Sequence, residues 1–249
     1  MGDPAVATPI GNPEPPKSII ERFIGVYISP GETFADIARK PDFIAPLIVG
    51  MVAAIAVTET MLAKIGMERI VRMSLEHSSQ ASSMTPEQMD QAVSRGANIG
   101  AIAAHVFGIL GVPIFLVIIA ALGLLFVNAI FGGQINFVKA LAVSCYANLP
   151  SVLGSVMAVA LIFFGDPEHF NPQSPMPSNL GFFLSPDTSK PLMVLASAGD
   201  IFSFWFMILL GIGYSEASGK KVKPLTIFLC FFGLRAVLLC AQMGVAMFQ

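Results

Sequence analysis

Apolar residues are gathered in five long runs, each containing at most one charged residue. The hydrocarbon core of a bilayer is about 30 Å thick, and roughly 20 apolar residues of helix cross it. Continuous apolar runs favour helices over the alternating strands of a membrane barrel. We therefore predict an all-α fold, a polytopic integral membrane helical bundle over residues 43–249. Its five transmembrane helices are Phe43–Ala63, Ile99–Phe131, Ala140–Gly165, Pro191–Ser215 and Pro224–Gln249.

The chain before the first run divides into two parts. Residues 1–16 contain five prolines and no apolar stretch, which predicts a disordered tail and not a signal peptide. Residues 17–42 predict two short amino-terminal interfacial helices. In the first, apolar residues face away from charged ones, which is typical of a helix in the headgroup region; a helix packed on the cytoplasmic ends of the spans is the alternative. Its apolar residues are Ile20, Phe23, Ile24 and Tyr27, and its charged residues are Lys17, Glu21 and Arg22.

The second interfacial helix begins with a capping-box pattern. Ser29 is the predicted N-cap, Pro30 occupies the first helical position and Glu32 lies three residues after the cap. The helix ends before Pro41, so it is too short to span, and we expect it to lie along the membrane surface. Phe34 would then face lipid and Asp36 water. Three aromatic residues are the expected interfacial anchors of the two helices: Phe23, Tyr27 and Phe34.

The connections between the runs also carry local signals. Arg69 and Arg72 suggest that the first helix continues past the membrane, and a capping box over residues 85–88 starts the second, which predicts a protruding helical hairpin. Pro113 and Pro150 predict helix kinks. The Gly165–Lys190 connection contains five prolines, which predicts an irregular loop. Its apolar residues 181–184 would rest on the bundle, dip into the membrane interface or form a docking surface for a partner.

Four ionisable residues fall inside the runs, where charges are costly. At about 1.5 Å of rise per helical residue, they lie within about 7 Å of one depth, with two further polar side chains nearby. One interpretation is a buried polar network that fixes helix packing, in which Arg235 pairs with Asp200 or Glu59, and Asp200 is favoured. The other is a path for an ion, a proton or a polar substrate. The predicted intramembrane polar network is Glu59, His105, Tyr146, Asn148, Asp200 and Arg235.

Composition and charge exclude several other classes of protein. Only 12% of residues are charged, against about 25% in an average soluble domain, and the spans leave no room for a separate soluble domain. The net charge of −2 gives no footprint for nucleic acid. No cluster has the spacing of a metal site, and we expect no cofactor and no enzyme activity. The three cysteines, all inside apolar runs, are expected to be small buried hydrophobes: Cys145, Cys230 and Cys240.

Lysine and arginine are distributed unevenly between the two sides of the predicted bundle. Eight flank the spans on the amino-terminal side and five on the other. Since cytoplasmic segments carry the excess of positive charge, we expect the amino terminus in the cytoplasm and the carboxyl terminus outside.

Three stretches follow one another in an order shared with a known family. They are Ser29–Ile37 with Pro41 and Pro46, then Phe131–Gln134 through Phe137 to Tyr146–Pro150, then Asp200–Trp205 through Gly211 to Ser218–Lys220. Their order resembles the Yip family, five-span membrane proteins named for binding Ypt/Rab GTPases in eukaryotes. The resemblance covers roughly Ile28–Gln249, and the last stretch is similar to bacterial members. It implies a five-span fold in a membrane, here the bacterial inner (plasma) membrane.

Two functional hypotheses follow from these observations. The first is a non-catalytic scaffold or accessory subunit that lies in the lipid bilayer, binds other integral membrane proteins and forms homo- or hetero-oligomers. The alternative is a transporter or an ion- or proton-conducting component that uses the mid-membrane polar layer. A water-filled cavity reaching Glu59, His105 and Asp200 would favour the transporter. A tightly packed polar layer with apolar contacts to another protein would favour the scaffold.

Overall fold

The computed structural model describes residues 15–76, 78, 83–165, 178–185 and 188–247, so most of the predicted tail lies outside the described residues. Within these ranges all regular secondary structure is helical. The helices that follow the apolar runs are α3 (Ile44–Lys64), α5 (Pro86–Leu124) continued by the π-helix η2 (Leu125–Ile130), α6 (Phe137–Ala147), α7 (Leu149–Phe164), α8 (Lys190–Ala198), α9 (Ile201–Ala217) and α10 (Pro224–Ala246).

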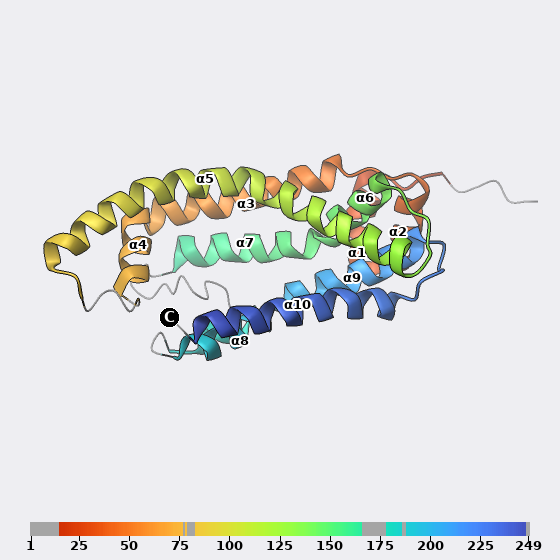
Figure 1. The fold of residues 1–249 in the computed structure, drawn as a ribbon. Coiled ribbons are helices and arrows are strands. Elements are labelled where there is room, and N and C mark those ends of the chain that lie inside the picture. Colours follow the sequence, from red (N-terminus) through yellow and green to blue (C-terminus); the bar gives the residue numbers. More distant parts are fainter. Residues whose placement is uncertain (1–14, 77, 79–82, 166–177, 186–187, 248–249) are drawn as a thin grey trace, which may run out of the picture.

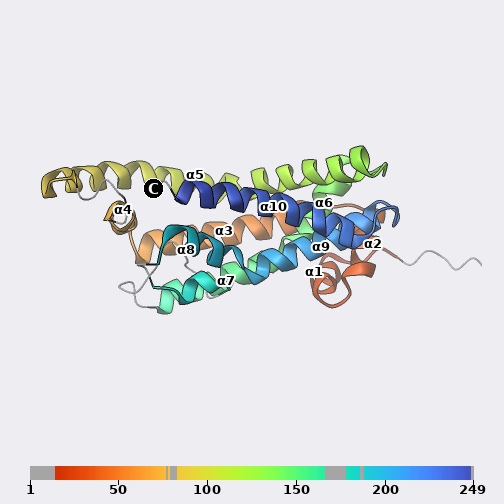
Figure 2. The ribbon, with the colours of Figure 1, turned by 60° about the horizontal axis from the view of Figure 1, so that its bottom comes forward.

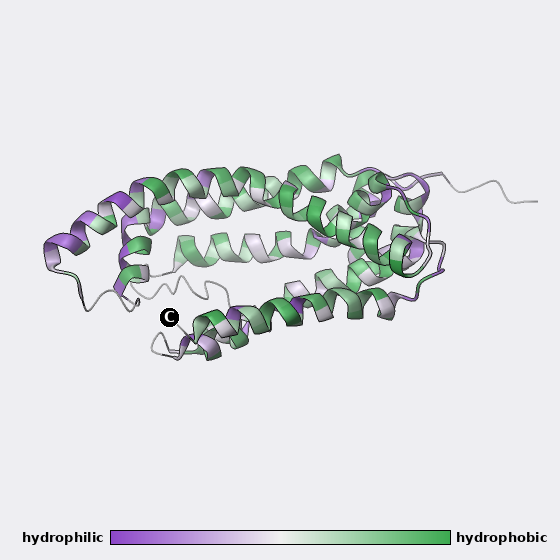
Figure 3. Ribbon diagram, in the orientation of Figure 1, coloured by the Kyte–Doolittle hydropathy of each residue, from purple (hydrophilic) through white to green (hydrophobic). Residues whose placement is uncertain are grey.

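These helices confirm the predicted membrane bundle. Four spans, two of them made of consecutive helices, are long and apolar enough to cross a bilayer: α3, α5 with η2, α6 with α7, and α10. A fifth candidate is the pair α8 and α9, which is bent by 47° at its break. They lie side by side, with apolar residues along their length and hydrophilic residues gathered towards the ends (Figures 1 and 3).

Packing is closest at one end of the bundle, where α1 (Ile19–Ile28) and α2 (Pro30–Arg39) lie with α6 and α9 (Figures 1 and 2). Phe34 of α2 is completely buried. Its ring lies over Gly213 of α9, where a Cβ atom would come within 2.9 Å of the ring. The buried core is therefore concentrated at the amino-terminal end, and the spans extend from it towards α4 (Met67–Glu76) and the carboxyl terminus (Figure 1).

Both predicted helix starts are confirmed, but only one of the two predicted capping boxes is formed. The box of Thr85 and Gln88 is present and confirms the start of α5. Ser29 is the N-cap of α2 and Pro30 its first residue, as predicted, but the predicted box is wrong, because the Ser29 side chain makes no capping hydrogen bond. A box that the sequence analysis missed starts α1, where the Ser18 side chain accepts from the Glu21 N–H and the Glu21 carboxylate accepts from the Ser18 N–H.

The segment after the first span forms a separate helix. The chain turns at Gly66, whose φ of +82° favours glycine, and α4 then packs against the start of α5. The prediction that the first helix continues through Arg69 and Arg72 is therefore wrong. Arg72 instead donates to Asp90 of α5 at 2.8 Å. Helix α5 is about 58 Å long at 1.5 Å per residue, so its first turns extend past a bilayer core and form a hairpin with α4.

The apolar stretch before α8 forms a short 3₁₀ helix, η4 (Leu180–Phe183). It contacts α8, and Gly181 is buried there. Leu180 and Phe183 remain exposed. The described part of this connection therefore rests on the bundle through one face only.

Candidate functional site

The most buried charged residues lie where α1, α2 and α6 meet. Arg22 Nε donates to Asp36 Oδ2 at 2.9 Å, and Arg22 Nη1 donates to Asp42 Oδ2 at 2.5 Å. Arg39 Nη2 donates to the other Asp36 oxygen at 2.6 Å. The Tyr146 hydroxyl donates to Asp42 Oδ1 at 2.7 Å. These five residues, which we call the Arg22 cluster, tie both amino-terminal helices and the entry to α3 to the bundle.

The cluster has a buried ion pair at its centre and two half-exposed charges, Arg39 and Asp42, at its edge. The side chains of Arg22 and Asp36 are 2% and 4% exposed, and the two arginines and two aspartates sum to zero charge. Burial raises the pKa of the Asp36 carboxyl, but hydrogen bonds from Arg39 and Arg22 outweigh burial and hold that pKa below its usual value. Since an unpaired buried charge is strongly destabilising, Arg22 and Asp36 require each other.

The sequence analysis missed this cluster because it assigned charged side chains to water. Arg22 shares its helix face with Gly25 and Val26, both of which are buried. Asp36 lies among the buried residues of α2, close to Phe34 and Ile37. A cation and an anion on the apolar faces of successive helices are the signal that identifies such a pair.

The three predicted interfacial anchors contact the protein. Phe34 is fully buried, so the prediction that it anchors α2 in the headgroup region is wrong. The prediction that Asp36 faces water is wrong for the same reason, because α2 packs into the bundle. Phe23 and Tyr27 are half-buried and make edge-to-face contacts with Tyr146 and Trp205. The large apolar residues exposed on α1 are four isoleucines: Ile19, Ile20, Ile24 and Ile28.

A second buried group joins α5, α6 and α9. The Tyr214 hydroxyl lies 3.0 Å from Ser144 Oγ, 3.2 Å from the Ala140 oxygen and 3.4 Å from the Ile119 oxygen. Ser144 and Tyr214 are both completely buried. The sequence analysis did not single out either residue. Because the hydroxyl groups satisfy one another and the backbone, they hold three helices together without charge.

The fourth span is broken where the sequence analysis expected a continuous helix. Asp200 is the N-cap of α9 and accepts a hydrogen bond from the Ser203 N–H at 2.7 Å. Its second oxygen accepts from the Ser178 hydroxyl. Arg235 of α10 donates from Nη2 to the Ala198 oxygen at 2.8 Å, at the end of α8. The predicted pairing of Arg235 with Asp200 or Glu59 is therefore wrong, because both residues satisfy the helix ends that the break exposes.

Glu59 and His105 form a separate pair between α3 and α5. His105 Nε2 lies 3.2 Å from Glu59 Oε1, and both side chains are about half exposed. His105 Nδ1 lies 2.7 Å from the Ala101 oxygen. Both ring nitrogens of His105 thus lie beside oxygen atoms.

Asn148 and Pro150 lie where the third span is divided. Helix α6 ends at Ala147, and α7 begins at Leu149 with Pro150 in its first turn. Gly50 of α3 passes close to this break, 3.5 Å from Asn148 Nδ2 when a Cβ atom is placed on it. Pro113 lies inside α5, and the helix continues on both sides of it.

The six residues of the predicted polar network therefore fall into separate places. Tyr146 belongs to the Arg22 cluster, Glu59 pairs with His105, and Asp200 and Arg235 serve the break between α8 and α9. Asn148 lies at the α6–α7 break. Across the described ranges, no group of three His, Cys, Asp or Glu residues is placed to hold a metal ion. These polar contacts hold helices and helix ends in position.

A bundle of apolar helices, closed at one end by buried ion pairs and hydroxyl groups, defines a polytopic helical membrane protein. A family model of the Yip1 domain matches residues 24–242. The chain therefore belongs to the Yip1 domain family, as its motifs suggest. No curated protein and no solved structure matches the chain significantly.

Proposed function

We propose that this Yip1-family protein is a non-catalytic membrane scaffold or an accessory subunit of a larger membrane complex. The observation that carries the proposal is that polar residues make contacts inside the bundle while apolar residues of the spans remain exposed. Most of the polar side chains described inside the bundle bind one another or cap helix ends, whereas large apolar surfaces of the spans stay uncovered. Such a molecule presents surfaces to neighbours and brings no reactive group to a common site.

The polar side chains support this proposal by their separation. The transporter hypothesis requires Glu59, His105 and Asp200 to line one path. Glu59 and His105 contact each other, whereas Asp200 is engaged by Ser178 and Ser203. Each of these three side chains has its own local partners. They therefore do not form the shared polar layer that the transporter hypothesis requires.

The apolar surfaces support it by their extent. Helices α3 and α10 each bury only 11% of their most apolar stretch within the chain. Phe107 of α5 and Val237 of α10 are 71% and 67% exposed. In a membrane such surfaces are covered by lipid or by the helices of another protein. We propose that part of this surface binds integral membrane partners.

We further propose the inner membrane of a bacterium, with the amino terminus in the cytoplasm. The excess of lysine and arginine on the amino-terminal side supports this orientation. The α9–α10 loop, which carries the only basic cluster of the sequence, lies at the same end as α1 and α2 (Figure 1). Reactivity of a cysteine placed at Ser18 from the cytoplasmic side tests it, and labelling from the outside would contradict it.

Site-specific photo-crosslinking in native membranes tests the scaffold proposal. A photoreactive residue replaces exposed Phe107 or Val237, and the matched controls replace Leu116 of α5 or Ile227 of α10, which are fully buried. We expect an exposed position to capture one reproducible membrane protein, and the buried controls to capture none. Capture of lipid alone would contradict the proposal. Ion flux through the reconstituted protein that is abolished by Glu59→Gln would favour the transporter.

A further inference from the structure

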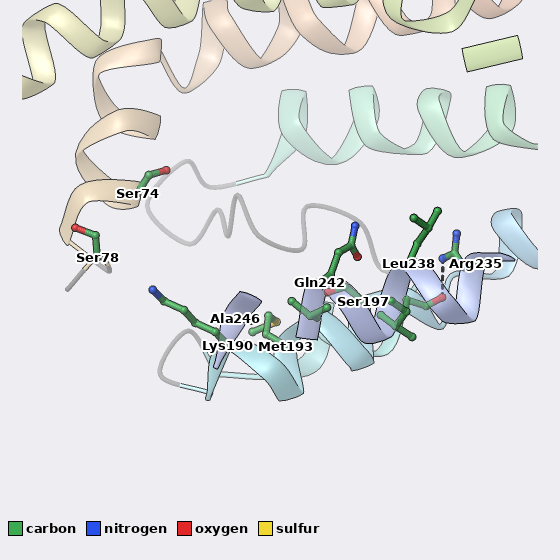
Figure 4. Close-up of a pocket in the computed structure, with 12 residues that line it drawn as sticks. Ser74, Ser78, Lys190, Met193, Ser197, Arg235, Leu238, Gln242 and Ala246 are labelled. Carbon is green, nitrogen blue, oxygen red and sulfur yellow. Dashed lines mark hydrogen bonds between the residues drawn. The ribbon is translucent and has the colours of Figure 1, made fainter. Parts of the chain in front are cut away.

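A cavity of about 660 Å³ lies between α4, α8 and α10, away from the Arg22 cluster. Arg235, Leu238 and Gln242 project into it from one side of α10, and Ser197 of α8 lies nearby (Figure 4). Lys190, at the start of α8, also lines it. The described residues that line the cavity include two cations, Arg235 and Lys190, and Arg235 is the one that lies midway along a span.

Arg235 has donors to spare in this cavity. It lies midway along α10, about 16 Å of helix from either end, where a charge is costly without a partner. One of its N–H groups is used at the Ala198 oxygen, which caps α8 and complements the negative end of that helix. A guanidinium has five N–H groups in a planar fork that suits the paired oxygens of phosphate or carboxylate. No carboxylate among the described residues contacts Arg235, so its charge is left for a ligand.

Ser197 gives an independent indication of a ligand. Its Oγ is buried and has no hydrogen-bond partner within the described part of the chain, although it lines the same cavity as Arg235. A buried hydroxyl without a partner costs free energy, and rotation of the Ser197 side chain towards the cavity would bring it to an oxygen-rich group there. Gln242 adds an amide that can donate to the same group.

The wall of the cavity beside Arg235 is largely apolar, whereas Ser74 and Ser78 line its opposite side. The apolar part consists of aliphatic and methionine side chains from α8 and α10: Met193, Val194, Leu238 and Leu239. An apolar wall offers no favourable contact to a free inorganic ion, whereas it can pack against an acyl chain. Because the cavity joins a mid-membrane cation to this wall, its ligand should combine an anionic head with an apolar tail.

We propose that this cavity binds a phosphate-bearing lipid, with the phosphate on Arg235, Ser197 and Gln242 and the acyl chain along Met193 and Leu238. The lipid satisfies the mid-membrane charge and fills the space between α8 and α10. The site therefore couples the broken fourth span to anionic lipid.

Thermal unfolding of the full-length protein in detergent tests the site. The probes are phosphatidylglycerol, phosphatidylcholine with the same acyl chains, and inorganic phosphate. We expect phosphatidylglycerol to raise Tm more than phosphatidylcholine does, and inorganic phosphate to leave Tm unchanged. Equal shifts with both lipids would overturn the proposal. A shift of the same size with inorganic phosphate would overturn the assignment to a lipid.

Three variants locate the effect. Arg235→Gln should abolish the preference for phosphatidylglycerol, whereas Lys221→Gln, which removes an exposed charge outside the cavity, should keep it. Ser197→Ala removes the unpartnered hydroxyl, so it should leave the lipid-free protein as stable as before while weakening phosphatidylglycerol binding about tenfold. If Arg235→Gln fails to fold, Ser197→Ala and Gln242→Leu carry the test. Unchanged lipid preference in both of them would overturn the proposal.

Discussion

The ring of Tyr214 lies directly against the backbone of Gly123. A Cβ atom at position 123 would be 2.0 Å from Tyr214 Cζ and 2.1 Å from its hydroxyl oxygen. This contact brings α9 against α5 closely enough for the Tyr214 hydroxyl to reach Ser144 of α6. The glycine therefore determines whether the uncharged polar group of the core can form.

We expect Gly123→Ala to destabilise the protein, because the added methyl group must displace a buried aromatic ring. Overpacking of this kind costs about 1–3 kcal/mol, and thermal unfolding in detergent measures it. Gly111→Ala is the matched control on the same helix, since a Cβ atom there meets nothing within 4 Å. The control should be neutral or stabilising by about 0.5–1 kcal/mol. Equal losses in the two variants would contradict the contact.

The Arg22 cluster predicts a large effect from a conservative change. Asp36→Asn keeps the shape of the side chain but removes the charge that balances buried Arg22, and breaking a buried pair costs about 3–5 kcal/mol. Chemical or thermal unfolding in detergent measures the loss. Arg72→Gln, which breaks the exposed pair with Asp90, is the control and should change stability little. A Tm of Asp36→Asn close to that of the control would show that the cluster is not buried in the membrane-embedded protein.

The same carboxyl predicts how stability depends on pH. The folded-state pKa of Asp36 lies below its ordinary value of 3.8. Its contribution is therefore fully present above that value and is lost as pH falls through the lower folded-state pKa. Between about pH 5 and about pH 3, the Tm of the wild-type protein should fall more steeply than that of Asp36→Asn. Parallel slopes for the two proteins would contradict the depressed pKa.

The sequence predicted the bundle well, because the length of an apolar run depends mainly on the bilayer. Helices α3 and α10 begin within a residue of their predicted starts. The break before α9 was not predicted, since the apolar run continues on both sides of Asp200. Aspartate after Gly199 is nevertheless a favourable N-cap, and this local chemistry outweighs the run.

The polar groups were harder to predict because their partners are distant in the sequence. Depth along a span placed Asp200 and Arg235 at one level, but depth alone does not distinguish a carboxylate from a helix carbonyl as the acceptor for Arg235. Tyr146 and Asp42 are 104 residues apart, and only the packing of α6 against the amino-terminal helices brings them together. Their pairing is a property of tertiary structure.

The mass of the protein extracted with its native neighbours tests the scaffold proposal most directly. The chain is 26.4 kDa, and native mass spectrometry after mild detergent extraction resolves added protein from added lipid. We predict a complex that contains this chain, a second membrane protein in fixed ratio, and bound lipid. Masses that correspond only to copies of this chain and lipid would contradict the proposal that it is an accessory subunit of a larger membrane complex.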